Sequence, residues 1–220
     1  MAKTIVLEGI DGSGKSTQFR LTCEQLDLLG VKHISYKFPR YDTPSGMNIR
    51  RYLSGEFGEH PGDVGAYAAS ALYAVDRYAS FRSEWREFYE KEENGIILLD
   101  RYTPSNAVHQ GAKLAPEERA AFYDWLADFE YRLMGLPEPD VVLILDMPPF
   151  YTRRLTRARG EEDIHERDGQ YMTLCYETMI DAAEHFGWTR IPCVENDEIR
   201  SPAEINALVM EEVRRVIKAF

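Results

Sequence analysis

Short apolar runs alternate along the chain with longer stretches of helical periodicity. Five runs are rich in β-branched and aliphatic residues, at 3–10, 31–38, 95–100, 140–147 and 189–194. Nearly uninterrupted apolar runs of this length are typical of strands in a parallel sheet that helices cover on both faces. The pattern therefore predicts a parallel sheet of about five strands.

Between these runs lie six stretches whose ends carry helix start and stop signals. Pro116 and Pro202 open two of them, and Gly30, Gly135 and Gly187 directly follow three, of which one is the stretch that Pro116 opens. Proline in the first helical turn and glycine after the last turn are favoured at helix ends. The predicted helices are 15–29, 65–91, 116–134, 149–158, 167–186 and 202–219.

The alternation of strand and helix predicts an α/β doubly wound fold, with one domain over residues 1–220. Such folds bind ligands at the carboxyl ends of their strands, so we expect the chemically distinctive residues there. The polar segment 157–169 lies between two predicted helices. Together with the residues just before it, this segment is a candidate flexible lid at about 153–169.

Composition and charge limit the kinds of molecule that the protein is expected to bind. The 220 residues carry a formal net charge of −11, with 44% apolar and 29% charged residues. A surface of this charge repels nucleic acid polymers and anionic membranes. We therefore expect no nucleic acid polymer and no membrane as partner, and a small phosphate-bearing ligand held by a local cluster of positive groups.

No segment approaches the roughly 20 apolar residues of a membrane span, and the N-terminal apolar stretch is too short for a secretory signal. The three cysteines, Cys23, Cys175 and Cys193, lie far apart without metal-ligand spacing. These observations predict core thiols and a cytoplasmic protein.

A phosphate-binding motif directly follows the first predicted strand. Residues 8–17 read EGIDGSGKST, in which Gly9, Gly14, Lys15 and Ser16 match the spacing G-x-x-x-x-G-K-[ST]. Glycines let backbone N–H groups converge on phosphate oxygens, the lysine reaches the outer phosphates, and the serine can ligate Mg²⁺. The residues expected around the nucleotide are Gly9, Ile10, Asp11, Gly12, Ser13, Gly14, Lys15, Ser16 and Thr17.

The phosphate loop alone does not decide the reaction, because switches, motors and kinases share it. A GTPase switch would carry Asn-Lys-x-Asp and, after the next strands, Asp-x-x-Gly, and neither is found there. Further segments are FPR at 38–40, LYAVDR at 72–77, LLDRYTPSNAVHQG at 98–111 and RARG at 157–160. In this order and over the whole chain, they resemble the thymidylate kinases, P-loop nucleoside monophosphate kinases that convert ATP and dTMP to ADP and dTDP.

The resemblance implies a second set of residues around dTMP. Asp11 would accept a hydrogen bond from the 3′-hydroxyl, and the guanidinium groups of Arg40 and Arg101 would hold the phosphate. Tyr73, where relatives usually carry Phe, would flank the pyrimidine with Arg77. The expected acceptor contacts are Asp11, Phe38, Arg40, Tyr73, Arg77, Arg101, Ser105, Asn106 and Gln110.

Phosphoryl transfer depends mainly on alignment and positive charge, so cations are the expected catalytic groups. Asp100, at the end of a predicted strand, and Ser16 would hold Mg²⁺. Gly12 groups the chain with relatives that supply an arginine from the lid, although Asp168 stands where some relatives carry an aromatic residue. The expected catalytic residues are Lys15, Arg101, Arg153, Arg157 and Arg159.

Simpler structural roles stay open for several of these residues. Asp11 could bond to the amides of its own turn, Arg40 and Arg101 could form surface ion pairs, and Asn106 could cap a helix. The lid arginines could be part of a solvated helix face.

Two other functions also stay open. One is the same reaction on another acceptor, such as dUMP or a deoxynucleoside, and the other is a nucleotide sensor without turnover. Deoxynucleoside kinases usually carry Glu-Arg-Ser where this chain has Asp100-Arg101-Tyr102, and the sensor would not need Lys15 and the lid arginines. The resemblance further implies a homodimer through long helices, for which the apolar positions of 65–91 are suited.

Overall fold

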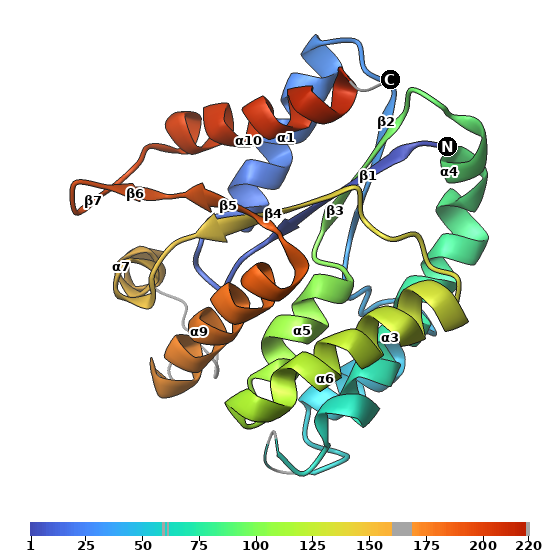
Figure 1. Cartoon of the computed structure of the whole chain (residues 1–220), viewed down its shortest axis with the longest axis vertical. Coiled ribbons are helices and arrows are strands. Elements are labelled where there is room, and N and C mark those ends of the chain that lie inside the picture. The colour runs from blue at the N-terminus through green and yellow to red at the C-terminus, as the bar shows by residue number, and fades with distance from the viewer. Residues whose placement is uncertain (59, 61, 160–168, 219–220) are drawn as a thin grey trace.

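Five parallel strands form the centre of the protein, of which the computed structural model describes residues 1–58, 60, 62–159 and 169–218. The strands are β1 (Lys3–Glu8), β2 (His33–Lys37), β3 (Ile96–Asp100), β4 (Val141–Asp146) and β5 (Thr189–Pro192). They pair in parallel in the order β2-β3-β1-β4-β5 (Figure 1). Each strand lies inside one of the five apolar runs, so the predicted parallel sheet is confirmed.

The carboxyl ends of neighbouring strands lie level at one edge of the sheet. Leu7 of β1 lies opposite Asp100 of β3, and Lys37 of β2 lies opposite the same aspartate. On the other side of β1, Glu8 lies opposite Ile144 of β4. The segments that follow β1, β2, β3 and β4 therefore start beside one another, at the edge where such sheets bind ligands.

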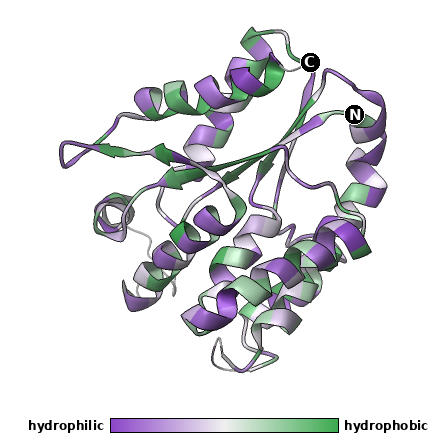
Figure 2. Cartoon of the chain, viewed as in Figure 1, coloured by the Kyte–Doolittle hydropathy of each residue, from purple (hydrophilic) through white to green (hydrophobic). Residues whose placement is uncertain are grey.

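Helices cover both faces of the sheet, as predicted. On one face lie α1 (Lys15–Leu28) and α10 (Pro202–Ile217), and on the other lie α3 (Ala66–Ser80), α5 (Thr103–Gly111), α6 (Pro116–Ala127) and α9 (Gly169–Phe186). Alternate residues of a strand point to opposite faces. Ile5 and Leu7 accordingly pack with residues of α1 and α10, and Val6 packs in the core of the other face. Figure 2 shows largely apolar strands between helices that carry hydrophilic residues.

Two of the predicted helices contain a π-helical turn. The range 65–91 comprises α3, the π-helix η1 (Phe81–Trp85) and α4 (Arg86–Lys91), and 116–134 comprises α6 and the π-helix η2 (Asp128–Leu133). A π-turn widens the helix by one residue and is frequent at functional sites. The positions of these ranges are confirmed, whereas the sequence pattern does not predict the widened turns.

Three further elements were not among the predicted ranges. They are α2 (Met47–Leu53), α5, and a short hairpin of β6 (Val194–Glu195) and β7 (Glu198–Ile199). The hairpin turn consists of Asn196 and Asp197, both with positive φ, which is the conformation that tight hairpin turns require. Among the described helices, none has the length and apolar character that a membrane crossing needs.

Part of the expected lid lies outside the described residues. The helix predicted at 149–158 is α7 (Pro149–Arg159), which follows β4. Residues 160–168, with Asp168, and the side chains of Arg157 and Arg159 are not among those described. The assignment of a lid to 153–169 therefore stays a prediction.

Candidate active site

The phosphate loop connects β1 to a helix whose first turn is uncapped. Gly14 precedes α1 with a φ of 92°, a backbone conformation that residues with a side chain rarely adopt. Among the residues that the structure describes, no side chain caps α1, and its first turn holds no acidic residue. In α10, by contrast, Ser201 caps the helix and accepts a hydrogen bond from the N–H of Glu204. The start of α1 therefore offers backbone N–H groups to an anion.

Lys15 folds back over this loop. Its Nζ donates hydrogen bonds to the carbonyl oxygens of Gly9 at 2.6 Å and Ile10 at 3.0 Å, and lies 3.8 Å from Oδ1 of Asp11. The side chain is only 8% exposed. Burial, and next the charge of Arg101, lower the pKa of Lys15 to about 8. A bound phosphate would therefore attract the Lys15 ammonium away from these two neutral carbonyl oxygens.

Arg101 follows β3 and reaches the phosphate loop from the other side. Its guanidinium forms an ion pair with Asp11, lies 3.7 Å from Oε1 of the buried Glu8, and contacts Nε2 of His109 at 2.9 Å. Burial opposes the charge of Arg101, but Asp11 and Glu8 outweigh it and the pKa is raised. Its φ of 67° is uncommon for a residue with a side chain, and such strain is often found at functional sites.

Arg40 is the second predicted phosphate clamp, and α3 fixes its position. The backbone N–H of Arg40 donates to Oδ2 of the buried Asp76 at 2.8 Å, and its Nε donates to Oδ1 at 3.3 Å. The guanidinium also pairs with Glu84 of η1 and donates to Ser45 Oγ at 3.3 Å. Gly46 lies so close that a Cβ there would be 2.0 Å from the Arg40 carbonyl oxygen.

Two buried polar atoms on α3 and α5 have no hydrogen-bond partner in the described part of the chain. They are Oγ of Ser70 on α3 and Oε1 of Gln110 on α5. Asn106, one turn before Gln110, donates to the carbonyl oxygen of Ser70 at 3.2 Å. Tyr73 lies one turn after Ser70, and burial raises the pKa of its hydroxyl. Buried polar groups are normally paired, so these atoms suit a polar ligand between the two helices.

Arg77, predicted to contact the base, forms a buried ion pair. Its Nε and Nη2 donate to Oε2 and Oε1 of Glu130 at 2.7 and 2.5 Å, and the two side chains are 2% and 0% exposed. Ser105, a further predicted base contact, donates to the carboxylate of Glu8. Phe38 packs in the core beside Tyr102. Contact of these residues with a substrate stays a prediction.

The expected magnesium ligands lie on both sides of the phosphate loop. Asp100 is 2% exposed, its Oδ1 has no hydrogen-bond partner among the described residues, and its Oδ2 lies 3.4 Å from Lys37 Nζ. Ser16 is exposed at the start of α1. A buried carboxylate and an exposed hydroxyl are suitable oxygen ligands for Mg²⁺, directly or through water.

The predicted catalytic arginines of α7 are only partly described. Arg153 is exposed on this helix, on the side of β1 away from β3. For Arg157 and Arg159 the structure gives the helical backbone alone. The catalytic roles of all three stay predictions.

Several residues that shape the site are absent from the predicted set. They are Glu8, Ser70, Asp76, Glu84, His109 and Glu130. Asp76 stands next to Arg77 in the VDR segment, and Glu8 ends an apolar strand, so both carry a local signal. Glu84 and Glu130 belong to no motif that names their partners, because only the fold brings them to their arginines.

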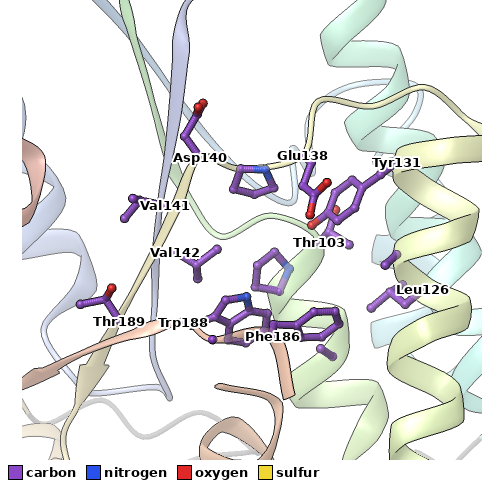
Figure 3. Close-up of a pocket in the computed structure, with 15 residues that line it drawn as sticks. Thr103, Leu126, Tyr131, Glu138, Asp140, Val141, Val142, Phe186, Trp188 and Thr189 are labelled. Carbon is purple, nitrogen blue, oxygen red and sulfur yellow. The ribbon is translucent and has the colours of Figure 1, made fainter. Parts of the chain in front are cut away.

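A cavity of about 160 Å³ lies on a different part of the molecule (Figure 3). Its lining includes Thr103, Leu126, Tyr131, Val142 and Trp188, and none of the predicted site residues. Small-molecule sites usually occupy at least roughly 300 Å³. The cavity is therefore not the nucleotide site.

Comparisons with known proteins agree with the resemblance noted in the sequence. The thymidylate kinase family model matches residues 7–198. A probable thymidylate kinase of Pyrobaculum aerophilum is 29% identical over 218 residues, 97% of each chain. Thymidylate kinases of Dinoroseobacter shibae and Mycobacterium tuberculosis (strain H37Rv) are 31% and 28% identical, over 94% and 72% of each chain. The chain belongs to the thymidylate kinase family.

Proposed function

We propose that this protein transfers the γ-phosphoryl group of ATP to dTMP and releases ADP and dTDP. Membership of the thymidylate kinase family supports this activity. One observation in the site carries the proposal: Asp11 lies between Lys15 and Arg101, so the predicted donor and acceptor sides share one ion-pair network. A reaction that joins two phosphates needs this proximity.

On the donor side, the N–H groups at the start of α1 bind the ATP phosphates, and Lys15 exchanges its two carbonyl partners for phosphate oxygens. Ser16 and Asp100 would hold a magnesium ion, which would supply positive charge against the phosphate oxygens of ATP. The α7 arginines, with Arg153 on the exposed side of the helix, add positive charge when the lid covers the site.

On the acceptor side, Arg40 and Arg101 bind the dTMP phosphate as guanidinium forks. Arg101 can turn from Asp11 to the phosphate, which leaves the Asp11 carboxylate available for the 3′-hydroxyl of the sugar. The base lies between α3 and α5, where Ser70 and Gln110 carry buried polar atoms without a hydrogen-bond partner among the described residues. Positioning and positive charge, without a covalent intermediate, then supply the catalysis.

We further propose that the protein works as a homodimer in the cytoplasm. The outer face of α3 is unusually apolar for a surface, with Tyr67, Val75 and Tyr78 exposed by 45%, 53% and 37%. Long helices form the dimer contact implied by the family resemblance. The same helix carries Asp76 and Arg77 on its inner face, so the contact would stabilise the acceptor site.

An ADP-release assay with a panel of monophosphates tests the reaction. With Mg·ATP, we expect dTMP to raise the rate at least about tenfold over the basal ATPase rate, and more than dUMP, dCMP or thymidine does. Lys15→Met is the matched control and should remove the stimulation. A rate that no monophosphate raises would favour the nucleotide sensor, and stimulation by dUMP alone would favour another acceptor.

A further inference from the structure

One buried carboxylate connects the two helices that carry the predicted base contacts. Glu130 of η2 is 0% exposed and accepts hydrogen bonds from four donors. Arg77 of α3 supplies two of them, at 2.7 and 2.5 Å. From α5, Thr103 Oγ1 donates at 2.8 Å and Asn106 Nδ2 approaches at 3.4 Å. Glu130 therefore holds α3 and α5 in one arrangement.

Glu130 occupies a position at which the sequence pattern calls for an apolar residue. It continues the buried face of α6, on which Leu126 and Tyr123 lie one and two turns earlier. A charge at such a position costs free energy unless it is fully paired, and an apolar pair of similar size is often at least as stable. The ion pair with Arg77 thus contributes little net stability, whereas it fixes the direction of the guanidinium.

The guanidinium of Arg77 keeps donors for a ligand after this pairing. A guanidinium carries five N–H groups. Glu130 takes two of them, and the Tyr102 carbonyl oxygen, at 3.5 Å from Nη1, takes a weak third. The contacts found in the described part of the chain leave two N–H groups on the terminal nitrogens.

These N–H groups belong to the same helix pair as the unpaired buried atoms of the site. Ser70 Oγ lies two turns before Arg77 on α3, and Gln110 Oε1 lies one turn after Asn106 on α5. The edge of a pyrimidine offers both donors and acceptors. A base held here would complete the hydrogen bonding that the protein alone leaves incomplete.

We propose that Glu130 is a positioning residue for acceptor recognition: its carboxylate sets the Arg77 guanidinium and the Asn106 amide in the orientation that contacts the base. Glu130 acts on the base through these two side chains and does not itself touch the substrate. The inference rests on the proposed dTMP kinase activity, and it adds a specificity-determining residue that the sequence motifs do not contain.

A double-mutant cycle on the full-length protein tests this role. Kinetics are measured for the unmodified protein, Glu130→Gln, Arg77→Met and the double variant, with dTMP and with ATP varied. We expect Glu130→Gln to raise KM for dTMP about tenfold or more, with kcat and KM for ATP changed less than about threefold. In the Arg77→Met background, the same substitution should add almost no further change, because the side chain that it positions is gone.

Selectivity between bases distinguishes a positioning role of Glu130 from a purely structural one, because a purely structural role would not change this selectivity. An unfixed guanidinium distinguishes the edges of thymine and cytosine less well, so the ratio of kcat/KM for dTMP over dCMP should fall in Glu130→Gln. Glu138→Gln is the matched control. This carboxylate is exposed at the cavity in Figure 3, close to Tyr131, and its loss should leave KM and the ratio unchanged.

The outcomes separate this inference from the proposed function. An unmodified protein that dTMP does not stimulate overturns both. Activity with dTMP together with an unchanged KM in Glu130→Gln, or additive effects in the cycle, overturns the role of Glu130 alone. If Glu130→Gln does not fold, Thr103→Val removes one neutral donor and leaves both charges paired. Its KM for dTMP should rise about two- to threefold, and an unchanged value overturns the inference.

Discussion

Lys15 is a side chain that is both charged and buried. Its ammonium is held by two carbonyl oxygens of its own loop, which are weaker partners than a phosphate. Its pKa of about 8 means that protonation of the free enzyme changes close to physiological pH. A bound triphosphate favours the charged form and raises this pKa again.

ATP binding should therefore take up a proton at alkaline pH. At pH 9 about nine in ten Lys15 side chains are neutral and must be protonated on binding, whereas at pH 7 most are charged already. The affinity for ATP should accordingly be greatest below pH 8 and fall above it. Calorimetry in buffers of different ionisation enthalpy measures the uptake, which should approach one proton at pH 9.

Lys15→Met is the control for this prediction, because it removes the titrating group and should remove the uptake at pH 9. Equal uptake at pH 7 and pH 9 in the unmodified protein would contradict the assignment of the pKa to Lys15.

The sequence predicts some residues of the site and not others for a physical reason. Lys15 and Gly14 act within a single turn, so their spacing along the chain is enough to predict their relative positions. Arg40 and Asp76, or Arg77 and Glu130, meet across 36 and 53 residues of chain. Their pairing depends on how helices pack, which no local pattern contains.

At the scale of elements, the sequence pattern predicts strands and long helices better than it predicts short or irregular segments. The five apolar runs are long enough to indicate buried strands. The π-turns η1 and η2 keep the helical pattern of their surroundings, so nothing in the sequence marks them. Yet each contributes a carboxylate, Glu84 or Glu130, to one arginine of the site.

The start of α2 lies very close to Arg40, the residue predicted to hold the acceptor phosphate. Gly46 precedes this helix, and a Cβ at this position would lie 2.0 Å from the carbonyl oxygen of Arg40 and 3.2 Å from Cα of Tyr41. These are backbone atoms that cannot move aside alone. A side chain at position 46 would therefore force the backbone around Arg40 or the start of α2 to shift.

Gly46→Ala should shift Arg40 and raise KM for dTMP about tenfold, with a smaller effect on KM for ATP. Steady-state kinetics with each substrate varied measures the two effects. Gly65→Ala is the matched control, since a Cβ at Gly65 has no atom within 4 Å and that glycine precedes α3 in the same way. A Gly46→Ala variant with unchanged KM for dTMP would show that Arg40 does not depend on this contact.

For the whole molecule, the parallel sheet determines where the site lies. The strand order β2-β3-β1-β4-β5 places the phosphate loop between the segments that follow β3 and β4. The sequence predicts parallel strands, because strands and helices alternate, and it predicts a site at their carboxyl ends. It does not predict the strand order, which depends on how the connections cross the sheet.

The proposed homodimer makes a prediction for the complete assembly. Val75→Glu places a charge in the exposed apolar face of α3, and we expect the mass measured by light scattering to fall from that of a dimer to that of a monomer. Leu28→Glu introduces the same charge at an exposed residue of α1 and should leave the mass unchanged. A monomeric unmodified protein, or a Val75→Glu variant that stays dimeric, would contradict the proposed contact.

Because β1 lies between β3 and β4, the residues predicted for the acceptor belong largely to α3 and α5, and those predicted for ATP belong to the loop after β1 and to α7. The two groups are connected chiefly through Asp11. A library of variants confined to α3, α5 and η2 could therefore be screened for kinases of modified nucleotides, such as antiviral analogues. The residues predicted to bind ATP would stay unchanged in every variant.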